Sequence, residues 1–123
     1  VYENNAPVYM RTHPLTVERI SDMQNRAQNA PYRQVPDSLE FQLVRAKLRA
    51  QMVTPREAVK EFAAQLREKK YASEAAARYG LAYSLLRAKD LATAQREVTA
   101  LIALKLSSPM IAGLVAEIRL AAN

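Results

Sequence analysis

His13 is the only histidine in a chain of 123 residues that has no cysteine, and this limits the chemistry available to it. A zinc site generally needs three protein ligands, and catalytic zinc sites depend heavily on histidine. There is no H-E-x-x-H motif, and two isolated glycines, Gly80 and Gly113, cannot form a phosphate-binding loop. A Ser-His-Asp triad built on His13 would lack a supporting G-x-S-x-G motif. We therefore expect no catalysis from this chain alone, no bound cofactor and no metal site within it.

The residues around His13 form a string with a defined spacing. Thr12, His13 and Pro14 are followed by Arg19 and Ile20, and this order resembles the (S/T)-H-P-x-x-x-x-R-(I/V) segment of the HtpX/BepA-like zinc metalloproteases, peptidase family forty-eight. In that family an H-E-x-x-H helix and a downstream Glu bind zinc, and this segment follows close to the end of the protease domain. The resemblance covers residues 8–35 by motif. Without it, His13 is interpreted as a solvated or hydrogen-bonded loop residue.

The resemblance implies roles for two residues. His13 would face the zinc ion, either as an auxiliary fourth ligand that blocks the open position or as a donor to the oxyanion of the reaction intermediate. Arg19 would fix a carboxylate or stabilise developing negative charge. Both would act only with a protease domain upstream, which would supply the zinc ligands and the general-base Glu. Residues 1–36 would then be the tail of that domain, and the chain, which opens on Val1, a segment of a longer precursor.

The same resemblance implies a cellular setting. The parent protein would be a zinc metalloendopeptidase in the periplasm or envelope of a Gram-negative bacterium, working in the quality control of envelope proteins. Residues 37–123 would bind its substrates or its partner proteins, among them the outer-membrane protein assembly machinery. The residues leave one alternative open, in which the chain is a stand-alone adaptor for protein–protein interactions.

The elements that would position these residues are all helical. Residues 1–15 contain Pro7 and Pro14 without a helical period, so we expect an extended arm. Thr16 is a plausible N-cap for a helix over residues 17–28. Capping signals from Asp37 onward predict five more helices, over residues 38–52, 55–69, 74–89, 91–106 and 109–121. The caps are two capping boxes, Asp37–Glu40 and Thr54–Glu57, followed by Ser73, Asp90 and the Ser108-Pro109 pair.

An internal repeat relates the helices after residue 37. A shift of 36 residues places Ala46 on Ala82, Ala58 on Ala94, Phe62 on Val98 and Thr54 on Asp90. This order of small and bulky residues resembles the tetratricopeptide repeat (TPR), a pair of antiparallel helices that stacks into a right-handed solenoid. The unit is slightly longer than usual, and its first copy has Arg45 and Arg49 where the pattern has apolar residues. An ordinary helical bundle remains the alternative.

The net charge of +6 is spread along the chain, which disfavours a nucleic-acid partner. No apolar run approaches the roughly 20 residues needed to span a membrane. We expect a protein or peptide partner instead, bound in the concave face of the repeats, with an acidic character complementary to basic side chains. The candidate partner-binding residues are Arg45, Arg49 and Arg56, with Lys47 and Lys60 beside them.

The last predicted helix is amphipathic and has no helix after it to pair with. Its apolar residues are Ile111, Leu114, Val115, Ile118 and Leu120. Such a face either closes the stack as a lid or remains available to another surface, including a second copy of the chain. We therefore expect possible self-association through this helix.

Overall fold

The computed structural model describes Pro7 and residues 16–123. His13 and the expected extended arm therefore lie outside the described residues. The chain divides into two units, Val1–Val35 and Pro36–Asn123, one residue before the boundary expected from the prolines.

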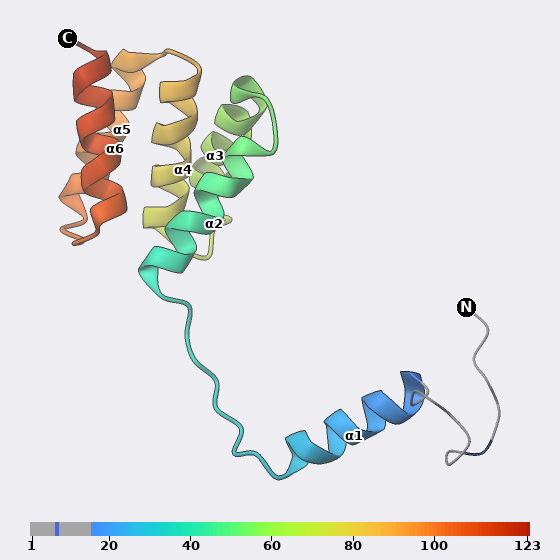
Figure 1. Ribbon diagram of the computed structural model, residues 1–123. Helices are drawn as coiled ribbons and strands as arrows, with labels where there is room; N and C mark the ends of the chain where they lie inside the picture. Colours follow the sequence, from blue (N-terminus) through green and yellow to red (C-terminus); the bar gives the residue numbers. More distant parts are fainter. Residues whose placement is uncertain (1–6, 8–15) are drawn as a thin grey trace. The chain divides into compact units, whose positions relative to one another are not determined.

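The described part of the first unit is built on α1, Thr16–Gln28 (Figure 1). The helix begins at Thr16, so Thr16 is its first residue and not the N-cap that the sequence suggests. Asp22 and Arg26, one turn apart, form an ion pair with a distance of 3.0 Å between carboxylate and guanidinium. No residue of this helix is buried, and its apolar residues Val17, Ile20 and Met23 are exposed.

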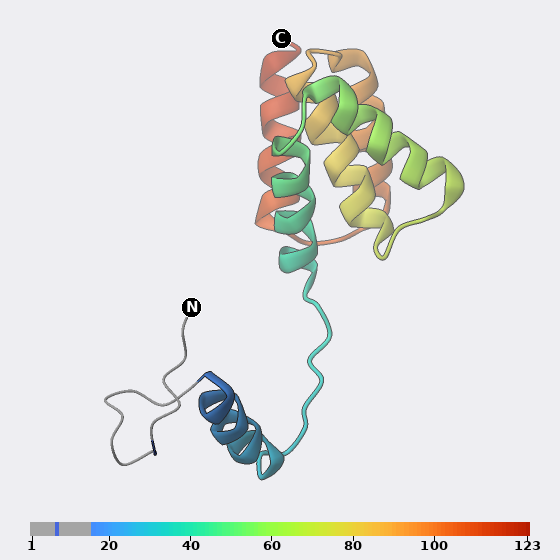
Figure 2. The same cartoon turned by 90° about the vertical axis from the view of Figure 1, so that its right-hand side faces the viewer.

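Residues 36–123, all of them described, form five helices joined by short turns (Figures 1 and 2). These are α2 (Leu39–Gln51), α3 (Pro55–Glu68), α4 (Glu74–Arg87), α5 (Leu91–Ala103) and α6 (Pro109–Ala121). The described residues contain no strand, which confirms the all-α fold class. The right-handed TPR-like solenoid stays a prediction.

Local capping residues start these helices. Thr54 makes the predicted capping box, in which its hydroxyl accepts from the Glu57 amide and the Glu57 carboxylate accepts from the Thr54 amide at 3.0 Å. The Thr54 hydroxyl also donates to the Glu57 carboxylate at 2.7 Å, and this bond, together with that from the Thr54 amide, lowers the pKa of Glu57. Ser73, Asp90 and Ser108 also cap as predicted. The first box is wrong: Ser38 caps α2 by accepting from the Phe41 amide at 3.1 Å, and Asp37 lies outside the helix.

Three helices end earlier than predicted because a lysine follows each in a left-handed conformation. Lys69, Lys89 and Lys105 have φ values of 55°, 62° and 55°. A non-glycine residue in this region stops the helix, because continuing it would need a negative φ. α3, α4 and α5 consequently end at Glu68, Arg87 and Ala103.

α4 is the central helix of the second unit. It packs extensively against α2, α3 and α5, and it has more buried residues than any other helix in this unit. The small residues matched by the repeat are all buried, as are Phe62 and Val98. Close helix packing needs small side chains where two backbones approach, so the 36-residue pattern reports a real packing constraint.

Gly80 lies where the Phe62 ring of α3 packs on α4. A Cβ atom added to it would lie less than 3.0 Å from the ring of Phe62, which is itself buried. Ser84, one turn later, is fully buried, and its hydroxyl donates to the Gly80 carbonyl at 2.6 Å. The ring of Phe62 therefore occupies the space that a side chain at position 80 would need.

Candidate protein-binding surfaces

The structure does not bring the two residues of the protease-like string together within its described part. His13 lies outside the described residues, as do Thr12 and Pro14. Arg19 is exposed on α1, beside the apolar residues Ile20 and Met23. Among the residues described, no group of three or more His, Asp or Glu side chains could hold a metal ion.

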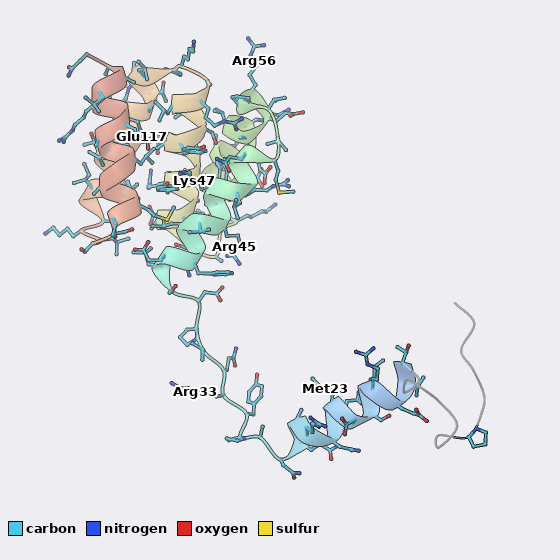
Figure 3. All side chains as sticks on the ribbon, viewed as in Figure 1. Met23, Arg33, Arg45, Lys47, Arg56 and Glu117 are labelled. Atoms are coloured by element: carbon cyan, nitrogen blue, oxygen red, sulfur yellow. The ribbon has the colours of Figure 1, made fainter. Side chains whose placement is uncertain are left out.

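Two of the three candidate arginines share a cleft. Arg45 and Arg49, on α2, line a cleft of about 360 Å³ whose other walls are α3 and the start of α4. We call this the basic cleft. Its lining includes Lys70 and Tyr71 from the turn before α4. Arg56 does not line it: Arg56 belongs to the first turn of α3 and lies toward the opposite end of the unit from Arg45 (Figure 3).

The charges in the basic cleft are partly matched. Arg49 donates two hydrogen bonds to the Glu61 carboxylate, at 2.9 and 3.0 Å, and these bonds raise the pKa of Arg49. The guanidinium of Arg45 lies 3.8 Å from the Asp37 carboxylate and 5.4 Å from the centre of the Phe41 ring. Arg45 is the more loosely held of the two, because it lacks a two-point contact of this kind.

Lys47 lies on another side of α2 and lines a second surface. This α2–α4–α6 groove has a volume of about 130 Å³ and includes Tyr79 and Tyr83 from α4 and Gly113 and Glu117 from α6. The ammonium of Lys47 lies 5.4 Å from the centre of the Tyr83 ring, and the Gln51 amide donates to the Tyr83 hydroxyl at 2.8 Å. The groove thus has a cation, a carboxylate and an oriented phenol within one small volume (Figure 3).

Tyr79 forms the buried side of this groove. Its ring stacks with that of Tyr83 at 6.4 Å between centroids, and only 3% of the residue is exposed. Burial, with the nearby negative charge of Glu117, raises the pKa of Tyr79 to about 12. Tyr79 therefore stays neutral at physiological pH and contributes an aromatic surface to the groove.

Gly113 is exposed on α6, and nothing in the structure fills the space beside it. A Cβ atom added there would have no other atom within 4 Å among those tested. A glycine inside a helix costs roughly 0.5–1 kcal/mol relative to alanine, and here packing in this unit gives no reason for it. A lone glycine within a helical pattern is the sequence signal that could have located this groove.

The outer side of α6 forms a third surface with α5. Its apolar residues include Ile102, Leu106 and Leu120, all exposed, and Leu120 is 73% exposed. The apolar face expected on α6 is nevertheless mostly packed within the second unit, because Ile111, Leu114 and Ile118 are buried and only Leu120 of that set is exposed. Self-association through it stays a prediction.

The fold and these surfaces define an all-helical protein of antiparallel hairpins, whose surface grooves have mixed apolar and polar linings. No family model, curated protein or solved structure matches the chain. No helix in the described part of the chain is long and apolar enough to cross a membrane.

Proposed function

We propose that residues 36–123 form a protein-binding module that takes an extended segment of a partner in the α2–α4–α6 groove. The observation that carries this proposal is the open space beside Gly113, bordered by Lys47, Tyr83 and Glu117. Glycine lets a ligand backbone come close to a helix. The lysine, the phenol and the carboxylate offer hydrogen-bond partners for peptide groups and for side chains of either charge.

We further propose that the chain is a C-terminal part of a zinc metalloprotease of the bacterial envelope. The Thr12-His13-Pro14 and Arg19-Ile20 string supports this by resemblance alone. In that protein His13 would act beside the zinc ion and Arg19 would support a carboxylate. The described residues form no zinc site, so an upstream domain would supply the ligands. The module would hold substrates or dock the enzyme on the outer-membrane assembly machinery.

A stand-alone adaptor is the second candidate. It is favoured by the division of the chain, because the second unit has its own core around α4. Such a unit can fold and bind without a protease domain. The gene upstream of Val1 distinguishes the two candidates. An H-E-x-x-H motif within the length of one or two domains supports the protease, and an open reading frame without one leaves the adaptor.

The groove itself is tested by Gly113→Leu. The probe is an array of extended peptides that tile outer-membrane protein sequences, with the whole chain as the binding protein. We expect the leucine side chain to fill the groove and to weaken binding about tenfold or more, because it excludes the peptide backbone from the helix. Ala116→Leu, on the same helix outside the groove, is the matched control and should bind as the unmodified chain does. Equal binding by both variants would rule out the groove as the site.

A further inference from the structure

Four large apolar side chains form an exposed stripe along α2 and its C-cap. Phe41, Val44, Leu48 and Met52 are spaced three and four residues apart, so they fall on one face of the helix. Their exposed fractions are 50%, 43%, 55% and 74%. The buried residues of α2, Leu43, Ala46 and Ala50, lie on its opposite face. We call the exposed set the outer stripe. Contiguous apolar surface of this kind marks an interaction site more often than chance does.

The internal repeat shows what covers this face in the next hairpin. The shift of 36 residues places the outer stripe on Ala77, Gly80, Ser84 and Ala88 of α4 and its C-cap. The first three of these are buried, and the ring of Phe62 from α3 lies directly on Gly80. The face of α4 that corresponds to the outer stripe is therefore the face on which α3 packs. By the same geometry, the outer stripe is shaped to receive a helix.

The side chains on the two faces differ in size, and this difference indicates which residues the docked helix needs. α4 has small residues here, and it receives the bulky Phe62. α2 has bulky residues at the same positions, so its partner needs smaller apolar residues at the contact if the two helices are to reach the usual 8–10 Å separation. The occupant is therefore an amphipathic helix with an apolar stripe at three- and four-residue spacing.

The charges beside the outer stripe favour an acidic occupant. Arg45 and Arg49 directly follow the stripe residues Val44 and Leu48, and α2 carries only one carboxylate, Glu40. Arg49 is engaged by Glu61, whereas Arg45 follows Val44 at the edge of the stripe, 3.8 Å from the Asp37 carboxylate and over the ring of Phe41, itself a member of the stripe. A helix with Asp or Glu beside its apolar stripe would pair with Arg45, and a helix with Lys there would be repelled.

We propose that the outer stripe of α2 is a docking site for an acidic amphipathic helix of a partner protein. The site is separate from the α2–α4–α6 groove, and the two can be occupied together. α2 and α3 lie on the side of the unit nearest the viewer in Figure 2. The first hairpin would thus bind its partner helix in the way that the second hairpin binds α3.

The test uses the whole chain and a synthetic helical peptide of about four turns, with Leu and Ala on its apolar stripe and Glu beside it. We expect saturable binding by fluorescence anisotropy, and a loss of about tenfold or more for Leu48→Glu, because a charge then faces the apolar stripe of the peptide. Leu120→Glu, another exposed leucine on α6, should leave binding unchanged. Circular dichroism and thermal melting would show that both variants keep the fold, since both side chains are exposed.

A charge reversal separates docking from non-specific adhesion. Arg45→Glu should weaken binding of the Glu-flanked peptide and strengthen binding of a Lys-flanked peptide with the same apolar pattern. Gly113→Leu should leave the binding of both peptides unchanged. Failure of the groove proposal and failure of the outer-stripe proposal therefore give different results. Absence of saturable binding, or equal binding by Leu48→Glu, would overturn the proposal. So would concentration-dependent dimerisation through the stripe, or its protection from solvent by a helix of the same polypeptide, since either assigns the surface to another occupant.

Discussion

The two hairpins of the second unit share a sequence pattern but differ in how they are packed. In the second hairpin, α4 contacts helices on both sides, and its residues Leu81 and Leu85 are buried. The corresponding residues of the first hairpin are Arg45 and Arg49, which line the basic cleft. α2 packs more extensively on α4 than on its own hairpin partner α3. The same repeat positions thus carry leucines that build a core in the second hairpin and arginines that line a surface in the first.

Two carboxylates at equivalent repeat positions show the same difference in burial between the hairpins. Glu61 and Glu97 are related by the 36-residue shift. Glu61 binds Arg49, half of whose side chain is exposed, whereas Glu97 binds Arg78 at 3.2 Å, with both side chains less than 30% exposed. Arg78 also binds Glu74 at 3.0 Å, which makes a three-residue network. The second hairpin therefore has the more buried ion pair, and the first keeps its arginines at the solvent boundary.

The largest effect that separates the hairpins is expected at Phe62. Phe62→Ala removes the ring that joins α3 to Gly80 and should lower the free energy of unfolding by about 3–5 kcal/mol. Phe41→Ala, at a half-exposed aromatic of α2, should cost about 0.5 kcal/mol or less. Urea denaturation followed by circular dichroism measures both. Similar costs for the two variants would mean that the outer stripe of α2 is covered, and the contrast between the hairpins would not hold.

The sequence could predict the features of this contrast that depend on near neighbours. Thr54, Ser73, Asp90 and Ser108 were identified as caps because each acts on an amide two or three residues away. Asp37 was assigned in place of Ser38 because adjacent residues can serve the same role, and backbone geometry chooses between them. The all-helical class followed from composition and period, which also act locally.

Features that depend on how the helices assemble could not be predicted from the sequence. Arg49 and Glu61 are 12 residues apart and meet only because α2 and α3 form a hairpin. Arg45, Arg49 and Arg56 could be named as candidates, but their separation onto different parts of the unit required the structure. Lys47 and Arg45 also line different surfaces, because Lys47 lies on another side of α2. The roles of His13 and Arg19 stay predictions.

The next largest effect is a loss of unfolding free energy in alkaline solution. We expect it to arise from Tyr79, in the second hairpin. Tyr79 corresponds to Leu43 in the repeat, and its pKa is raised from 10.0 to about 12. Between these values the unfolded chain loses the phenol proton while the folded chain retains it, so stability falls as pH rises from 10 to 12. The loss should be about 2 kcal/mol at this position.

Tyr79→Phe is the matched control, because it keeps the stacked ring and removes the titrating group. Its unfolding free energy should decline less than that of the unmodified chain over the same pH range. Tyr83→Phe, at the more accessible tyrosine of the stacked pair, should leave most of the decline in place. An unchanged decline in Tyr79→Phe would assign the alkaline effect to other groups and would remove this distinction between the hairpins.

The smallest predicted effect is the change in stability when each of the two glycines is replaced by alanine. This change depends strongly on the local geometry. Gly80→Ala gains helix propensity of about 1 kcal/mol, but its Cβ collides with the buried ring of Phe62, and overpacking costs about 1–3 kcal/mol. The net result should be a loss of about 1 kcal/mol. Gly113→Ala meets no atom and should gain up to about 1 kcal/mol. Thermal unfolding of the two variants under identical conditions gives the comparison directly.

Opposite signs for two identical substitutions would show that environment, and not glycine itself, sets their energies. Val44 strengthens the argument, because it occupies the position of Gly80 in the first hairpin and is 43% exposed. Because this position is partly open to solvent, a β-branched residue is accommodated there. If Gly80→Ala were stabilising as well, Phe62 would be free to move aside and the joint between α3 and α4 would be loose. A loss at Gly80 with a gain at Gly113 instead means that the packing of Phe62 requires one glycine, while no packing contact in the unit requires the other.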